Sequence, residues 1–253
     1  MRGHGFMYRQ QSESNRHEAI RCYEQALAGD PASVDVKIGI AFVLIANVAD
    51  GWSLSAEQDL ARAERLLLDV LHINGEIVRA HTSLGILRRL QGRLDESQIE
   101  FETALGLAPN HATTMGQLGV TLSLLGLPEA AIPLIEKSIR LAPYHPLAPL
   151  SYNFLGTCHL LLNNIEEAVI CFKKSRAGNP RLFFTHLGLA AAFGLKGELG
   201  EAAAALRQAV EIRPEIGSLS DLRAWPSLTN PKFLALFERT ICAGLRHAGL
   251  PDE

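Results

Sequence analysis

A repeat of 34 residues constrains the fold of this 253-residue chain more than any other feature of its sequence. Thirty-four residues separate Pro109 from Pro143, and the same spacing separates Pro180 from Pro214. The step from Pro143 to Pro180 is 37 residues, so three residues are inserted there. Each proline closes a short recurring phrase: Leu107-Ala108-Pro109, Leu141-Ala142-Pro143, Gly178-Asn179-Pro180 and Ile212-Arg213-Pro214. Such a period predicts an array of units that stack on their neighbours.

Each unit has the same internal layout. A helix-forming stretch leads to a residue that tolerates the left-handed conformation, and these residues are Gly92, Gly126, Asn163 and Gly197. Acidic residues then open a second stretch, where exposed helix amides favour carboxylates, and the proline ends it. Aromatic residues make up only 6% of the chain, while Ala and Leu dominate. This composition favours helices over strands, so the sequence predicts an all-α fold.

The pattern within the units resembles the tetratricopeptide repeat (TPR), a helix–turn–helix of 34 residues. Its Leu-Gly pair is found in three units as Leu84-Gly85, Leu118-Gly119 and Leu155-Gly156. Its second half is found as Ser97, Phe101, Ala104 and Pro109, and again as Ala168, Phe172, Ser175 and Pro180. The resemblance implies a right-handed superhelical solenoid of these units, with a concave groove that binds partner proteins.

The register of the motifs predicts six units, an irregular linker and a C-terminal capping helix. The expected bounds are about 1–33, 34–77 with an insertion at 47–58, 78–111, 112–148, 149–182 and 183–214 for the units, 215–229 for the linker and 230–249 for the cap. In the insertion, Ser55 followed by Gln58 fits a capping box. Asn230-Pro231 fits the start of the last helix. Phe233, Phe237 and Ile241 share one face of it, which we expect to cover the last repeat.

The chain also has a narrower resemblance. Four stretches are similar to the C-terminal TPR region of bacterial class III adenylate/guanylate cyclases and related regulators: Asp50-Gly51-Trp52-Ser53, 87–93, 131–137 and 233–251. In those proteins such a region follows a catalytic or DNA-binding domain. The resemblance therefore implies a signalling scaffold, without cyclase activity in this chain.

Composition argues against several other functional classes. A formal net charge of −3 gives no basic footprint for nucleic acid. The N-terminus has no secretory signal, and the longest apolar stretch, Leu182 to Leu195, is too short to cross a bilayer. The four scattered cysteines favour neither disulfides nor a zinc site. We therefore expect a cytoplasmic protein without membrane attachment.

No familiar catalytic or cofactor-binding motif is found in the sequence, so we expect neither enzymatic activity nor a cofactor or metal. His81 and His186 occupy a packing position of their units. Cys158 and His159 are adjacent and point to different sides of a helix, so they form no ready thiol–base pair. Arg88, Arg89 and Arg93 are either a solvated helix end or an anchor for an acidic partner.

The concave groove is the expected binding site, lined by positions two, five, nine and twelve of each first helix. Its candidate partner-binding residues are Phe42, Arg79, Thr82, Ile86, Arg89, Val120, Ser123, Asn153, Thr157, Phe184 and Leu187. Some TPR cochaperones clamp a carboxylate with Lys and Asn at positions five and nine, and no unit of this chain has that combination. The groove is mostly apolar, which suits an amphipathic helix or the host protein's own missing domain.

These observations predict a non-catalytic protein–protein interaction scaffold in bacterial signalling. Two alternatives stay open. One is a detached regulatory TPR region of an adenylate/guanylate cyclase or transcriptional regulator, and the other is a docking subunit of an enzyme such as a glycosyltransferase. The partner is a protein or peptide, and the sequence fixes neither its identity nor the oligomeric state.

Overall fold

The structure, a computed structural model, describes residues 13–225 and 228–253. Within these ranges every regular element is a helix, as the sequence predicts. The chain divides into two compact units, which we call unit 1 (residues 1–109) and unit 2 (residues 110–253). The start of the first predicted repeat, residues 1–12, lies outside the described residues.

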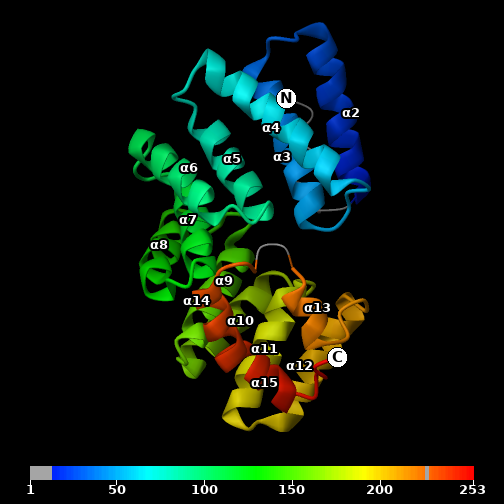
Figure 1. The fold of residues 1–253 in the computed structure, drawn as a ribbon, viewed down its shortest axis with the longest axis vertical. Coiled ribbons are helices and arrows are strands. Elements are labelled where there is room, and N and C mark those ends of the chain that lie inside the picture. Colours follow the sequence, from blue (N-terminus) through cyan, green and yellow to red (C-terminus); the bar gives the residue numbers. More distant parts are fainter. Residues whose placement is uncertain (1–12, 226–227) are drawn as a thin grey trace. The chain divides into compact units, whose positions relative to one another are not determined.

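Unit 1 consists of successive helices in which each first helix packs on the helix that follows it (Figure 1). The helices are α2 (Glu13–Gly29), α3 (Val34–Ala49), α4 (Ala56–Ile73), α5 (Val78–Leu90) and α6 (Leu94–Leu107). Its pairing depends on small residues that admit aromatic rings. A Cβ atom on Gly39 would lie 2.7 Å from the Tyr23 ring, and one on Gly85 would lie 2.7 Å from Phe101. The Leu-Gly position of the motif is therefore where a large side chain of the paired helix fits.

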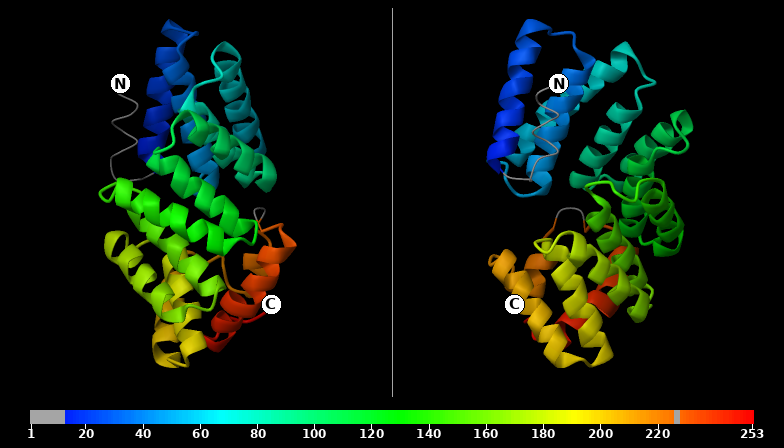
Figure 2. Two further views of the ribbon diagram at one scale, coloured as in Figure 1. Left: turned by 90° about the vertical axis from the view of Figure 1, so that its left-hand side faces the viewer. Right: turned by 180° about the vertical axis from the view of Figure 1, so that it is seen from behind.

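Unit 2 continues the same arrangement with three helical pairs and then a shorter C-terminal set (Figure 2). The pairs are α7 (Ala112–Leu124) with α8 (Pro128–Leu141), α9 (Ala148–Leu161) with α10 (Ile165–Gly178), and α11 (Phe183–Lys196) with α12 (Leu199–Ile212). The set consists of α13 (Leu219–Arg223), α14 (Pro231–Phe237), the π-helical turn η1 (Glu238–Cys242) and α15 (Ala243–His247). Phe172 is fully buried where α10 meets α9 and α11, next to Gly156 and Gly188.

The four turn residues predicted from the sequence all adopt positive φ. Gly92 and Gly126 have φ of 75°, Gly197 has 78°, and Asn163 has 61°. Glycine and asparagine reach this region at low cost, and each turn lets the chain reverse into the next helix. This part of the repeat is confirmed.

The insertion in the second predicted repeat, which belongs to unit 1, is shorter than expected. Helix α3 continues to Ala49 and α4 begins at Ala56, although residues 47–58 were expected to interrupt the repeat. The capping box of Ser55 and Gln58 is wrong, because Ser55 makes no side-chain cap. The Ser53 hydroxyl instead donates to Asp59, with 2.7 Å between Oγ and Oδ2, and accepts from the Ser55 amide at 3.2 Å.

A buried arginine holds this loop against α2. The Arg16 side chain is 7% exposed, ion-pairs with Asp50, and places its guanidinium carbon 4.4 Å from the centre of the Trp52 ring. A cation over an indole face is favourable when water is excluded. The inserted loop of unit 1 is therefore attached to the repeat that precedes it.

The stretch expected to be an irregular linker contains a helix, which corrects the prediction for 215–229. Helix α13 begins with a capping box between Ser218 and Asp221. The Leu219 amide donates to the Pro251 carbonyl at 2.9 Å, and the Ser220 amide donates to Asp252 at 3.1 Å. The C-terminal tail thus satisfies amides that any helix start leaves open, and no local sequence signal reveals these acceptors.

Candidate functional site

The predicted groove positions of unit 1 face each other across α3 and α5. Asp35 and Arg79 hold the second position of these helices and form an ion pair, with 2.9 Å between Oδ1 and Nη1. Phe42 and Ile86 share the ninth position. Phe42 is 37% exposed, although the residues on either side of it in α3 are buried, and Ile86 is half-buried. An aromatic side chain left in water on a buried helix favours contact with a partner.

The other two predicted groove residues of unit 1, Thr82 and Arg89, interact with other residues of unit 1. Thr82 is only 6% exposed, and its hydroxyl donates to the Val78 carbonyl at 2.8 Å. Arg89 is half-buried, with its guanidinium carbon 6.0 Å from the centre of the Phe101 ring. Burial lowers the pKa of Arg89 to about 10, so this side chain stays charged at neutral pH.

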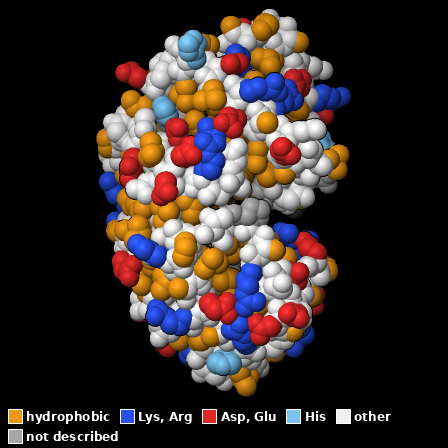
Figure 3. All heavy atoms as spheres, in the orientation of Figure 1, with side chains coloured by type: hydrophobic (Ala, Val, Ile, Leu, Met, Phe, Trp, Pro, Cys, Tyr) orange, Lys and Arg blue, Asp and Glu red, His pale blue; other side chains and the backbone are white. Residues whose placement is uncertain are grey.

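The basic cluster next to this face is neutralised within the chain. Arg88 is 7% exposed and donates to Glu64 of α4, with 2.6 Å between Nη1 and Oε1, so it is not part of a solvated helix end. Burial raises the pKa of Glu64, but hydrogen bonds from Arg88 and Gln91 outweigh this, and the net pKa is lowered. Arg93 pairs with Glu96 at the start of α6. Figure 3 shows acidic and basic side chains interspersed over the visible face.

Most of the predicted groove residues of unit 2 are in the interior. Val120, Ser123, Asn153 and Leu187 are each less than 9% exposed, whereas Thr157 is half-buried and Phe184 is 37% exposed. The Thr185 hydroxyl donates to the Asn153 amide oxygen at 3.2 Å and accepts from Ser175 at 2.7 Å. Asn153 therefore joins α9 to α11 and α10, and it does not line an open groove as the sequence predicted.

A small cavity of about 40 Å³ opens between α7, α8 and α9, where the three residues are inserted. Val120 lines it together with Ile135 and Phe154. Roughly three water molecules would fill this volume.

The C-terminal helices pack against α11 (Figure 1). The α11 residues that they contact most closely are ones that the repeat register assigns to the groove of unit 2. We call residues 231–250 the C-terminal segment. At its centre, a Cβ atom on Gly244 would lie 2.1 Å from the Ala191 carbonyl oxygen. One on Gly194 would lie 2.0 Å from the Gly244 carbonyl oxygen. Ala191 and Gly194 are groove positions nine and twelve of α11, so two helix backbones touch here.

The segment lies on the last repeat, where the sequence placed the last helix, and it also reaches the repeats before it. The segment packs chiefly on α11, and it also contacts α9 through η1 and α12 through α15. Near its start, Lys232 and Phe233 contact Gly126, at the turn after α7. The segment therefore crosses three successive repeats along their first helices. Its predicted start is confirmed, because the Asn230 side chain accepts from the Lys232 amide at 2.9 Å.

An apolar face holds the segment in place. The side chains of this face are all buried in the core of unit 2: Phe233, Phe237, Ile241, Cys242, Leu245, Ala248 and Leu250. The rings of Phe233 and Phe237 stack at 5.7 Å. Nearby, Trp225 lies edge-on to Phe184 with ring centres 4.7 Å apart, so it covers the second groove position of α11.

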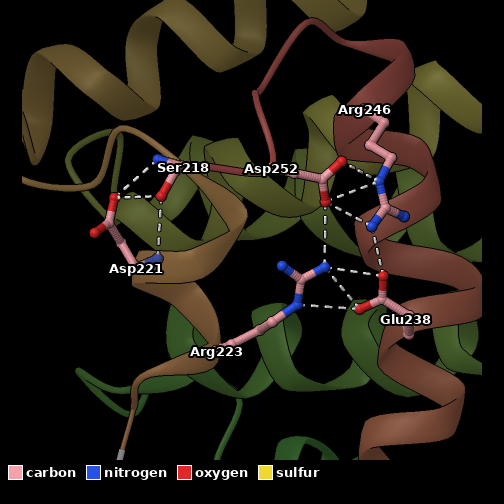
Figure 4. A network of polar contacts seen from close by, with 6 residues as sticks. All are labelled: Ser218, Asp221, Arg223, Glu238, Arg246 and Asp252. Carbon is pink, nitrogen blue, oxygen red and sulfur yellow. Dashed lines mark hydrogen bonds and ion pairs between the residues drawn. The ribbon is translucent and has the colours of Figure 1, made fainter.

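A network of four charged side chains ties the segment to α13 and the tail (Figure 4). Glu238 accepts from Arg246, with 2.6 Å between Oε1 and Nη2, and from Arg223 at 2.9 Å. Asp252 accepts from the same two arginines. Hydrogen bonds from Arg223 and Arg246 lower the pKa of Glu238 to about 2. The network is partly exposed, so screening by water limits its contribution to stability.

Two cysteines and one histidine of the described residues belong to the packing of the fold. Cys158 and Cys242 are buried thiols whose pKa desolvation raises to about 12. His81 connects Glu100, at 2.6 Å from Nδ1, with the Gly75 carbonyl, at 2.9 Å from Nε2, so it joins a turn to a helix as a packing residue would. Among the described residues, no three His, Cys, Asp or Glu side chains are grouped as metal ligands.

Membrane-spanning length is also lacking in the described residues. No helix in residues 13–225 or 228–253 combines the length and hydropathy needed to cross a bilayer.

The sequence did not reveal that unit 2 places a segment of the chain on its own groove. The available signal was the glycine at 244, in the middle of a stretch predicted to be helical. Glycine weakens an exposed helix, so its presence there indicates a close backbone approach. Gly194, the residue that Gly244 contacts, stands at a groove position. The two glycines together would have indicated that the last helix packs on α11.

A family model and a known protein each match part of this chain. The tetratricopeptide repeat family model matches residues 76–143 and 110–181. The BBSome complex member BBS4 of Bos taurus is 30% identical over 130 residues, which are 51% of this chain and 24% of that protein. The chain thus spans about a quarter of the length of this relative.

Solved structures share the fold at low sequence identity. The Cut9–Hcn1 structure, an APC/C hetero-tetramer, has a TM-score of 0.71 at 17% identity over 83% of this chain and 39% of that one. The pilF protein of Pseudomonas aeruginosa has a TM-score of 0.61 at 20% identity, over 88% of this chain and 93% of that protein. YrrB, described as a TPR protein with an unusual peptide-binding site, has a TM-score of 0.50 at 17% identity, over 76% of this chain and 93% of YrrB.

TPR proteins are generally non-catalytic scaffolds for protein–protein interaction. The helical pairs, the match of residues 76–181 to the family model and the likeness to these structures identify the fold of this chain as a tetratricopeptide repeat solenoid.

Proposed function

We propose that this chain is a non-catalytic scaffold that binds an apolar segment of a partner protein on the concave face of unit 1, across α3 and α5. Phe42 carries the proposal. It is 37% exposed on a helix that is otherwise buried through its middle. Aromatic side chains of this kind contribute much of the affinity where proteins meet, because each buries a large apolar area at little entropic cost.

The neighbouring residues support an apolar occupant. Ile86 has the same register as Phe42 on the next first helix, so the two extend one apolar strip. The only groove carboxylate of α3, Asp35, is already paired with Arg79, and this pair borders the strip without leaving excess charge. A partner segment with apolar residues along one side therefore fits this surface better than an acidic peptide.

The test is site-specific crosslinking in cells of the native host. A photoreactive phenylalanine analogue is placed at position 42, and in a matched control at position 99 of α6, where Ile99 is 60% exposed. We expect one protein to be crosslinked from position 42 and not from position 99.

Substitutions then connect the crosslinked protein to the strip. Association of that protein with the full chain is expected to be lost on Ile86→Asp and retained on Ile99→Asp. Equal crosslinking from both positions, or association that survives Ile86→Asp with the fold intact, would refute the proposal.

The signalling setting is a further part of the proposal and is supported by the resemblance of four stretches to TPR regions of cyclases and related regulators. In that setting the chain regulates and does not catalyse. Purified chain incubated with ATP or GTP is expected to form no cyclic nucleotide above a boiled control. An in-frame cyclase or winged-helix domain upstream of Met1 in the genome would favour the alternative of a detached regulatory region.

A further inference from the structure

We propose that the concave face of unit 2 is a second helix-binding groove, that the C-terminal segment occupies it as an internal ligand, and that a partner helix of the same pattern binds there by displacing this segment. The proposal deepens the scaffold function and rests on it. The pattern is two aromatic residues four apart, followed by a glycine where the helices cross.

The seated segment shows which chemistry this face accepts. Phe233 and Phe237 stack on each other and join the buried core of unit 2. Seven residues after Phe237, Gly244 lets the segment touch the backbone of α11 at Ala191 and Gly194. Any side chain at this position of a ligand helix would collide with backbone, which cannot rotate away. The groove is therefore selective for a small residue at the crossing point.

The attachment of the segment is that of a bound helix. Its hold is mainly an apolar face laid into a groove, the mode in which amphipathic helices bind their receptors. Its polar ties are few and peripheral. They are the partly exposed ion pair between Glu238 and Arg223 of α13 and one contact of 3.1 Å between His247 Nδ1 and the Gly194 carbonyl. The covalent connection between α13 and α14 runs only from Ala224 to Asn230.

The tether makes the segment a strong competitor. A helix on a short connection acts at an effective concentration in the millimolar range. A partner helix then binds only the fraction of molecules whose groove is open, so its apparent dissociation constant rises by the reciprocal of that fraction. A change that unseats the segment must therefore raise the affinity for a helix supplied from outside.

The experiment uses the full chain and a synthetic peptide of its residues 230–250 as the probe. Gly244→Leu in the chain prevents the segment from seating, because a Cβ atom there meets backbone at 2.1 Å. Calorimetric titration is expected to show the peptide binding this variant at least about tenfold tighter than the unmodified chain. A peptide that itself carries Gly244→Leu is expected not to bind. Gly200→Leu is the matched control, since nothing lies within 4 Å of Gly200.

Three results would overturn the proposal. A folded Gly244→Leu chain that does not bind the peptide would show that the face is no receptor. Equal affinity of the variant, the control and the unmodified chain would place the peptide elsewhere. If the variant does not fold, hydrogen exchange of the unmodified chain decides. Exchange of residues 231–248 as one group before α9 and α11 supports the proposal, and equal protection refutes it. The crosslink at position 42 lies in unit 1, so each proposal can fail without the other.

Discussion

The two units share one repeat pattern but differ in what covers the groove positions of their first helices. In unit 1 the ninth position of α3 leaves Phe42 in water. In unit 2 the ninth position of α11 lies under Gly244 of the chain itself. The residue types at these positions account for the difference. Unit 1 has Phe42 and Ile86 at the ninth position, and their side chains prevent close backbone contact. Helix α11 has Ala191 at the ninth position and Gly194 at the twelfth, which permit it. Small residues turn a concave face into a helix seat, and large ones leave it as a surface for a partner.

Removing one buried aromatic ring from each unit tests whether the two units unfold separately. Phe101 and Phe172 are both fully buried. Replacing either by Ala should cost about 3–5 kcal/mol of unfolding free energy, because a large cavity is left. Since repeats couple to their nearest neighbours, Phe101→Ala should lower hydrogen-exchange protection in unit 1 and Phe172→Ala should lower it in unit 2. Equal loss of protection throughout the chain after either change would mean that the two units unfold as one.

A smaller change tests the helix seat alone. Gly194→Ala should lower the unfolding free energy by about 1–3 kcal/mol in urea titrations, because its Cβ meets the Gly244 carbonyl at 2.0 Å. Its control, Gly200→Ala, should raise that free energy by roughly 0.5–1 kcal/mol, since an open glycine in a helix gains from a Cβ. Two variants of equal stability would mean that α15 does not press on α11.

Acidification should loosen unit 2 before unit 1. The pKa of Glu238 is lowered to about 2 by Arg223 and Arg246, and that of Asp252 is lowered by the same residues. A lowered folded pKa contributes stability above the unfolded pKa, which is lost as pH falls toward the folded value. The protection of residues 231–248, measured against the intrinsic exchange rate at each pH, should therefore fall between about pH 4.5 and pH 2, more than the protection of α3. Glu238→Gln should remove most of this difference, whereas retention of it would assign the pH dependence to other groups.

The smallest expected effect on stability is at Phe42. Phe42→Ala should lower the unfolding free energy by about 1 kcal/mol, because the ring is already 37% exposed and full burial of a Phe side chain is worth about 1.5–3 kcal/mol. A urea titration checks this value. A loss of several kcal/mol would show that Phe42 supports the fold of unit 1, and the case for a binding role would disappear.

Local features of the sequence predicted the repeat well. Gly92 and Asn163 mark turns because the left-handed conformation is needed within the same few residues. The exposure of Phe42 also follows from the repeat register. Asn153 was assigned to the groove and is buried instead, because its partner Thr185 lies 32 residues away. Helix α13 was missed because its amides find acceptors at Pro251 and Asp252. Contacts of this length carry no periodic signal in a single sequence.

The chain has two tryptophans, and the structure places one in each unit. Trp52 lies beneath the guanidinium of Arg16, and Trp225 lies against Phe184. Their emission therefore reports on two separate places, the inserted loop and the edge of the C-terminal helices. Trp52→Phe leaves a chain whose fluorescence follows unit 2, and Trp225→Phe leaves one that follows unit 1. A binding event on either concave face can thus be assigned to its unit in solution without a label.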